Sequence, residues 1–276
     1  MKKQIIEKFY NQNGNILKGN SQDLSFEKVD NIVYEVIRVI DGIPLFLEEH
    51  IERLNKSANL LNYDITDILD TITKDIKKVI DLNNNPNKNL KILLYNIEKP
   101  VPNYYIFFIE SNYPANELYQ TGIKTITYKA IRENPQAKTI NKKFRKNVNI
   151  EISKNNAYEA LLINELGEIS EGSRSNVFFV KNDSIYTAPG KNVLLGTTRK
   201  KIIKICDELN FEVNEKPITI EFLKTCDALF ITGTSPKVLP ISQVDEITFD
   251  SPNNKVVQRI MKTYDSLIND YINIHK

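Results

Sequence analysis

The sequence has few of the residues that cross-link a chain or bind a metal. Its 276 residues include only two cysteines, Cys206 and Cys226, and neither lies in a CxxC pair or among histidines. A disulfide framework or a zinc site is therefore not expected. No apolar run reaches the length of a transmembrane helix, and the first residues lack the apolar segment of a signal peptide. These absences predict a cytoplasmic protein that does not interact with a membrane.

The chain also lacks a strong net charge. Its 37 basic and 35 acidic residues leave a formal charge of +2, so no net field attracts nucleic acid or anionic lipid. The charged fraction of 26% is ordinary for a globular protein, and the length suffices for one large domain or two smaller ones. A site for a small anion must therefore be local, and no nucleic-acid partner is expected.

Short strands and helices are predicted along the whole chain. β-Branched residues on both sides of the Asp41-Gly42 turn predict a hairpin over residues 31–47. Apolar residues spaced three and four apart predict a helix over 48–61. Further helices are expected over 65–82, 141–155 and 197–210, and further strands over 90–97, 103–111, 123–131, 158–164, 175–180 and the two arms of 227–241, with turns at Pro100 and Pro102 and at Leu166-Gly167.

Interspersed short strands and helices predict a mixed α/β fold of the α+β type in two domains. A polar, turn-forming stretch near residues 113–122 is the expected boundary. The expected division is a smaller N-terminal α/β domain over 1–115, a linker over 116–122 and a larger C-terminal domain over 123–276 that binds the ligand.

The segment "LLGTTR" suits an anion. It places Gly196, Thr197 and Thr198 at the start of a predicted helix, where unpaired backbone N–H groups and the helix dipole favour negative charge. The alternative is that one of the two threonines simply caps the helix. The segment does not match a Walker loop, because threonine rather than lysine follows Gly196.

Two further features suit a phosphate group. Gly233 and Thr234 follow a predicted buried strand and could present amides and a hydroxyl to an anion. Arg53 shares a helical face with His50 and could direct its guanidinium into a cleft. The plainer alternatives are a simple turn for the first feature and a surface ion pair between Arg53 and Glu49 for the second.

Glu171 raises a separate question. It lies in a turn rich in Gly, Ser and Asn, "EGSRSN", that runs directly into the apolar strand "VFFV". A carboxylate beside a buried strand costs free energy unless a positive group meets it. The sequence therefore predicts a cationic partner for Glu171.

Taken in order, several segments resemble the class IV, or fold-type IV, family of pyridoxal-phosphate enzymes. The family includes branched-chain and D-amino-acid aminotransferases and aminodeoxychorismate lyase. The resemblance covers nearly the whole chain, and "SEGSRSNVFFV" followed by "LLGTTR" is its most specific part. The similar segments are "YEVIRV", "FLEEHIERLNKSANLL", "YEALLINELGEISEGSRSNVFFV", "LLGTTR" and "ALFITGTSPKVLPI".

The resemblance implies pyridoxal 5'-phosphate as cofactor and assigns it ligands. Glu171 would pair with the pyridine nitrogen and keep it protonated, which makes the ring an electron sink. Arg53 would bind the phosphate, and Gly196 would let the backbone come close to it. The remaining implied cofactor ligands are Thr197, Thr198, Gly233 and Thr234.

Such an enzyme needs a lysine for its Schiff base, and "QAKTINKKFRK" offers Lys138, Lys142 and Lys143. In the family the lysine lies about twenty residues before the aromatic residue that opens the next strand, and Lys138 lies at about that distance from Tyr158. Lys142 and Lys143 fall inside the predicted charged helix. The resemblance therefore favours Lys138, which would also move the proton at the substrate Cα.

The substrate is less defined. The Arg-x-His pair with which D-amino-acid enzymes of the family bind the substrate carboxylate has no counterpart in "KILLYNIEKPV". Branched-chain enzymes of the family often show Tyr-x-Arg in this region, and here Tyr95 is followed by Asn96 and Ile97, so the tyrosine is present without the arginine. Tyr34, Arg38 and Tyr95 are the candidates for binding the substrate, with cross-strand packing as the alternative for Tyr34 and Arg38.

Three functions are therefore open. The first is transamination between a branched-chain-like or D-amino acid and a 2-oxo acid, by an enzyme that the resemblance implies is a homodimer. The second is a lyase that releases pyruvate from aminodeoxychorismate with the same lysine and cofactor. The third is a non-catalytic protein that binds a phosphate ligand and in which the lysine has no covalent role.

Overall fold

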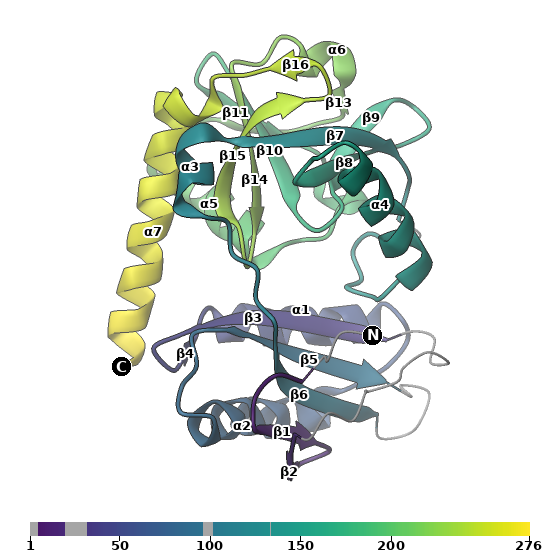
Figure 1. Ribbon diagram of the computed structural model, residues 1–276, viewed down its shortest axis with the longest axis vertical. Coiled ribbons are helices and arrows are strands. Elements are labelled where there is room, and N and C mark those ends of the chain that lie inside the picture. The colour runs from purple at the N-terminus through teal and green to yellow at the C-terminus, as the bar shows by residue number, and fades with distance from the viewer. Residues whose placement is uncertain (1–4, 20–31, 96–101, 133) are drawn as a thin grey trace. The chain divides into compact units, whose positions relative to one another are not determined.

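The computed structural model describes residues 5–19, 32–95, 102–132 and 134–276. The chain divides into two compact units (Figure 1). Unit 1 comprises Met1–Asn112, Ala137–Ile140 and Ile268–Lys276, and unit 2 comprises Tyr113–Gln136 and Asn141–Leu267. In the described part of the chain, no helix combines the length and apolar character needed to span a membrane.

The described residues of unit 1 form one sheet, two whole helices and the C-terminal end of a third helix. The strand order is β2-β1-β6-β5-β3-β4, and neighbouring strands are antiparallel. The strands are β1 (Phe9–Gln12), β2 (Asn15–Lys18), β3 (Val33–Ile40), β4 (Ile43–Pro44), β5 (Asn89–Tyr95) and β6 (Asn103–Ile109), and the helices are α1 (Leu47–Asn59) and α2 (Thr66–Leu82).

The hairpin predicted around Asp41-Gly42 is present, although its second strand has only two residues. Asp41 and Gly42 have φ angles of 51° and 80°, as a type I′ turn requires, and its twist matches that of the paired strands. The predicted turn at Pro100 lies outside the described residues.

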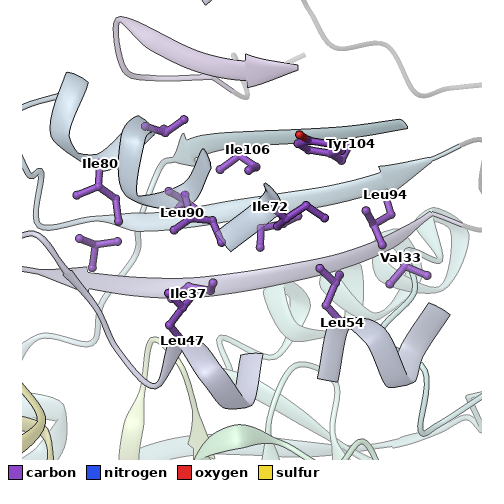
Figure 2. Close-up of a cluster of buried hydrophobic side chains, with 14 of the residues drawn as sticks. Val33, Ile37, Leu47, Leu54, Ile72, Ile80, Leu90, Leu94, Tyr104 and Ile106 are labelled. Atoms are coloured by element: carbon purple, nitrogen blue, oxygen red, sulfur yellow. The ribbon is translucent and has the colours of Figure 1, made fainter. Parts of the chain in front are cut away.

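Both helices cover the same face of this sheet, where the core of unit 1 lies (Figure 2). Because strand side chains alternate, every second residue of β3, β5 and β6 points to this face. Leu54 and Ala58 of α1 contact it through the spacing that predicts the helix, and Leu47, one residue before the predicted start, packs in the same cluster. The other buried members of the cluster are Val33, Ile37, Val39, Ile65, Ile72, Ile76, Val79, Ile80, Leu90, Ile92, Leu94, Tyr104, Ile106 and Phe108.

Unit 2 contains a larger sheet. Among the described residues it has ten strands, ordered β12-β11-β10-β14-β15-β7-β8-β9-β13, with β16 paired to β15. The strands are β7 (Ile123–Lys129), β8 (Glu159–Ile163), β9 (Glu168–Gly172), β10 (Asn176–Lys181), β11 (Ser184–Thr187), β12 (Val213–Glu215), β13 (Ile218–Thr219), β14 (Ala228–Gly233), β15 (Lys237–Val244) and β16 (Ile247–Thr248). The helices are α3 (Asn116–Thr121), α4 (Lys142–Lys154), η1 (Gly190–Asn192), α5 (Thr197–Glu208), α6 (Ile220–Leu223) and η2 (Ser251–Asn253), and α7 (Lys255–His275) continues into unit 1.

The pairing of β7 explains why α4 lies where it does. β7 is parallel to β8, and parallel neighbours require a long crossover connection, which here contains α4. β10, β14 and β15 are antiparallel neighbours, and the 234–236 turn joins the last two. The mixed α/β fold class predicted from the sequence is therefore confirmed.

Four segments lie elsewhere than the expected domain division places them. Residues 113–115, expected in the N-terminal domain, belong to unit 2. Residues 116–121 of the expected linker form helix α3 of unit 2. Residues 137–140 and 268–276, expected in the C-terminal domain, belong to unit 1. The physical reasons are contacts with the rest of unit 1: Thr139 forms a β-bridge with Val33, and the Tyr271 hydroxyl donates a hydrogen bond to Glu48. Such contacts join residues far apart in the chain, so sequence patterns do not reveal them.

Candidate active site

Glu171 lies in strand β9 rather than in the turn predicted for it, because residues 168–172 pair with β8 and β13. Its side chain is buried, and Arg132 Nη1 lies 3.0 Å from its Oε1. The backbone N–H of Leu194 donates to Oε2 over 3.0 Å. The carboxylate beside the apolar strand thus has the cationic partner that its burial requires.

Arg132 is absent from the residues selected by sequence. It lies 39 residues before Glu171, in the loop after β7, and no spacing rule links the two. The only available signal is chemical, since a buried carboxylate implies a guanidinium or ammonium group somewhere in the fold. The pair fixes the carboxylate at the end of β9.

The segment Leu194–Gly196 is held by Asn176, the first residue of β10. Asn176 Nδ2 donates a hydrogen bond of 2.8 Å to the carbonyl oxygen of Leu194. A Cβ atom on Gly196 would collide with Asn176 Oδ1. Glycine is therefore required here by the close approach of a buried side chain.

Gly196 is also the N-cap of α5, and no side chain caps that helix. Thr197 and Thr198 occupy its first two helical positions and are buried, so the alternative in which one of them is the cap residue is wrong. Tyr264 of α7 donates a hydrogen bond of 3.4 Å to Thr198 Oγ1. The N–H groups of the first turn, which have no intrahelical acceptor, are those available to an anion.

The Gly196→Ala variant is expected to lower the free energy of unfolding by about 1–3 kcal/mol. The added methyl group would force either the Leu194–Gly196 segment or the Asn176 side chain to move. Denaturant unfolding of the wild type and the variant measures this difference. In an Asn176→Ala background the obstructing amide is gone, so the same glycine substitution should cost clearly less. An equal cost in both backgrounds would contradict the collision.

The second predicted anion loop lies near the first. Strand pairing sets Asn176 opposite Thr232 of β14, directly before Gly233 and Thr234. Asn176 therefore lies between the Leu194–Gly196 segment and the end of β14, where Gly233 is the last strand residue and Thr234 begins the 234–236 turn. Thr232 Oγ1 is buried and has no hydrogen-bond partner among the described residues.

Arg53 in unit 1 is buried within helix α1 and pairs with Glu35 of β3. Its Nε and Nη2 each lie 2.7 Å from a Glu35 carboxylate oxygen, a bidentate arrangement. The alternative of a surface ion pair with Glu49 is wrong, because Arg53 is only 7% exposed. Among the described residues its Nη1 has no hydrogen-bond partner, so that amino group is available for a phosphate oxygen.

His50 completes this group. Burial lowers the pKa of His50, while the neighbouring Glu35 carboxylate opposes the shift. The imidazole is therefore neutral at pH 7, and its Nδ1, 2.9 Å from Glu35 Oε2, must be the donor because a carboxylate only accepts. Burial alone would raise the pKa of Glu35, but the Arg53 guanidinium and the His50 hydrogen bond lower it to about 2.

Lys138 also belongs to unit 1. Its backbone N–H donates to Ser57 Oγ of α1 over 3.2 Å, and its carbonyl oxygen accepts from the N–H of Tyr34 over 3.0 Å. The side-chain Nζ lies 4.8 Å from the centre of the Tyr34 ring. Lys142 and Lys143, the other candidate lysines, are exposed on α4 of unit 2.

The candidate substrate residues share one face of the unit 1 sheet, opposite the face that α1 and α2 cover. The register pairs Val36 of β3 with Lys91 of β5, so Lys91 and Tyr95 lie on the face that carries Tyr34 and Arg38. Lys91 Nζ is 5.5 Å from the centre of the Tyr34 ring. Lys91 is absent from the residues selected by sequence, although a lone lysine inside an apolar strand is a usable signal.

The site residues thus divide between the two units. Unit 1 brings Lys138 to Tyr34 and to helix α1, the helix of Arg53, while unit 2 brings Glu171 to the segment before Gly196. The full unit 1 set is Tyr34, Arg38, Arg53, Tyr95 and Lys138, and the full unit 2 set is Glu171, Gly196, Thr197, Thr198, Gly233 and Thr234.

These groups fit pyridoxal 5'-phosphate in their chemistry. Glu171 is a carboxylate held by a guanidinium and an N–H group, as a partner of a protonated ring nitrogen should be. The uncapped start of α5, the buried Thr232 hydroxyl and the Nη1 group of Arg53 are donors suited to phosphate oxygens. No group of three or more His, Cys, Asp or Glu side chains suited to a metal occurs among the described residues.

Comparisons with known proteins agree with this chemistry. The sequence matches the family described as "Amino-transferase class IV" over residues 32–244. It is 30% identical over 245 residues to a D-alanine aminotransferase of Bacillus licheniformis, and the match covers 83% of this chain and 86% of that protein. It is 33% identical over 257 residues to a putative branched-chain-amino-acid aminotransferase of Methanocaldococcus jannaschii, with 83% of each chain covered.

Solved structures give the same fold. The branched-chain amino acid aminotransferase of Thermobaculum terrenum, solved in its PLP form, has a TM-score of 0.83 at 20% identity and covers 98% of this chain and 96% of that one. The Escherichia coli branched-chain enzyme has a TM-score of 0.85 at 24% identity, with 95% of both chains covered. The chain therefore belongs to the class IV family of pyridoxal-phosphate-dependent aminotransferases.

Proposed function

We propose that Lys138 is the lysine that binds pyridoxal 5'-phosphate covalently and that Glu171 holds the ring nitrogen. Arg53 would bind the phosphate through Nη1. The loops at Gly196–Thr198 and Gly233–Thr234 would supply its backbone and hydroxyl donors. The observation that carries this assignment is the buried Glu171 carboxylate, which Arg132 and the Leu194 N–H keep as an acceptor.

Each residue then has a separate task. When bound, the cofactor supplies an electron sink for the substrate carbanion. Lys138 takes the proton from the substrate Cα, a step that needs its ε-amine neutral. Glu35 orients Arg53, because it fixes one edge of the guanidinium and leaves Nη1 for the phosphate. Tyr34, Arg38 and Tyr95 would contact the substrate.

We infer that the amino donor has an uncharged aliphatic side chain. The two relatives described above are named for D-alanine and for branched-chain amino acids. These donors differ in enantiomer and size, but they share an apolar side chain. The acceptor would be a 2-oxo acid.

The first experiment is a visible absorption spectrum of the purified protein, repeated with each enantiomer of alanine, valine, leucine and glutamate. We expect a cofactor band that is bleached by one enantiomer of the aliphatic amino acids, and a new amino acid formed from 2-oxoglutarate. Release of p-aminobenzoate and pyruvate from aminodeoxychorismate, without transamination, would identify the lyase instead. A protein that stays colourless after incubation with pyridoxal 5'-phosphate would contradict both.

We also propose that the enzyme is a cytoplasmic homodimer. The dimer rests on the family resemblance, and light scattering coupled to size-exclusion chromatography tests it. The location is supported by the two buried cysteines, which are free thiols and form no disulfide.

A further inference from the structure

Two lysines lie beside the same tyrosine ring in unit 1. The Nζ atoms of Lys138 and Lys91 are 4.8 Å and 5.5 Å from the centre of the Tyr34 ring. The two nitrogens are therefore no farther apart than the sum of these distances. At such a separation in a half-buried site, two like charges repel each other appreciably.

Lys91 is an unusual lysine for a strand. It lies between the buried residues Leu90 and Ile92 of β5, and no carboxylate of the described residues forms an ion pair with it. Burial lowers the pKa of Lys91, and the charge of Lys138 adds to this shift, while Tyr34 opposes it. Coulomb repulsion is mutual, so Lys91 must act on Lys138 in the same direction.

The strands of this face, as far as the structure describes them, supply little compensating negative charge. In β1, β3, β5 and β6 the only acidic residue is Glu35, which points to the opposite face and is paired with Arg53. Arg38 adds a further positive charge to the face that carries Lys91. The remaining titratable groups of that face are the phenols of Tyr10, Tyr34, Tyr95 and Tyr105. On the α1 side, His50 has an electrostatic interaction with Lys138, and its imidazole is neutral at pH 7.

We propose that Lys91 is a positioning residue whose ε-ammonium disfavours a second positive charge at Lys138 and so keeps the Lys138 ε-amine in its neutral form. The proposal rests on the role assigned to Lys138 under the proposed function. Only the neutral amine has the free electron pair needed to act as a nucleophile or to accept a proton. Lys91 itself needs no contact with cofactor or substrate.

The test is a pH titration of Lys138 in the full-length chain before pyridoxal 5'-phosphate is added. The protein is labelled with a limiting amount of acetic anhydride at a series of pH values, and mass spectrometry measures acetylation of Lys138. In the Lys91→Met variant, the midpoint, which is the pH at which Lys138 acetylation is half-maximal, should rise by about one unit. The Lys91→Arg variant, which keeps the charge at every pH used, should not raise it. The matched control is Lys78→Met, which removes an exposed charge from α2 on the other side of the sheet.

A second readout follows cofactor uptake. The rate at which the visible band develops after addition of pyridoxal 5'-phosphate should fall about tenfold at pH 7 in Lys91→Met, since the neutral fraction of Lys138 falls by that factor. An unchanged midpoint in Lys91→Met, or an equal rise in Lys91→Arg, would overturn the proposal. Failure of the proposed function would look different, because the midpoint would still shift while no cofactor became attached to Lys138.

Discussion

The Lys138→Ala variant is expected to lose the visible band of covalently bound cofactor and to lower kcat by at least about 10²- to 10⁴-fold. That range corresponds to loss of acid–base catalysis alone, and loss of covalent attachment adds to it. Lys138 is placed for this role by two backbone hydrogen bonds, to Ser57 and from Tyr34, which do not involve its side chain. The variant should therefore keep the wild-type fold, and circular dichroism checks this.

The controls are Lys142→Ala and Lys143→Ala, which remove the two other lysines of the same sequence segment from the exposed surface of α4. Both should retain the band and the activity. Borohydride reduction of the wild type followed by peptide mapping should show the cofactor on the peptide that contains Lys138. Cofactor found on Lys91, Lys142 or Lys143 would refute the assignment.

The Glu35→Gln variant is expected to lower the free energy of unfolding by about 3–5 kcal/mol at pH 7, because it leaves Arg53 buried without a counter-charge. The loss should be confined to unit 1, so the backbone amides of β3 and α1 should exchange their hydrogens faster in the variant than in the wild type. Denaturant unfolding measures its size. The control is Glu52→Gln, an exposed position on α1 next to Arg53, where a change within about 0.5 kcal/mol is expected.

The same pair predicts a pH dependence. The pKa of Glu35 falls to about 2 in the folded protein from an ordinary value of 4.5. A carboxyl group with a lowered pKa contributes stability that is complete above its unfolded pKa and is lost as the pH falls through its folded pKa. The wild type should therefore lose its advantage over Glu35→Gln between about pH 4.5 and pH 2. A difference that stayed constant over this whole range would contradict the ion pair.

Most of the regular elements could be predicted from local patterns. Apolar spacing over 48–61 predicts α1, and the segment 197–210 predicts α5, because an amphipathic helix repeats its buried face every three to four residues. Glu171 shows the limit of this approach. Its segment is rich in turn-forming residues, yet it is a strand, because β8 and β13 supply hydrogen-bond partners that local sequence does not contain.

The candidate site was predictable only in part. The motifs around Glu171 and Gly196 identify a pyridoxal-phosphate enzyme, and membership of the class IV family confirms that assignment. The roles of Lys138, Arg53 and the threonines stay predictions. Arg132 and Glu35 could not be selected, because their importance depends on burial and on partners elsewhere in the chain. Lys91 had one usable signal, its place as a lone lysine inside an apolar strand, but only the fold shows that Lys138 lies near it.

The sequence by itself therefore determined the fold class, the family and the cofactor of this protein, since these follow from local periodicity and from motifs that are short in sequence. The tertiary structure decided which charges are paired and which are not. It places Arg132 beside Glu171 and Glu35 beside Arg53. Within the part of the chain that the structure describes, it leaves Lys91, which lies near Lys138, without a carboxylate partner of its own. The physical reason is that the energy of a charge depends on its distance from other charges and from water, and the fold alone sets both.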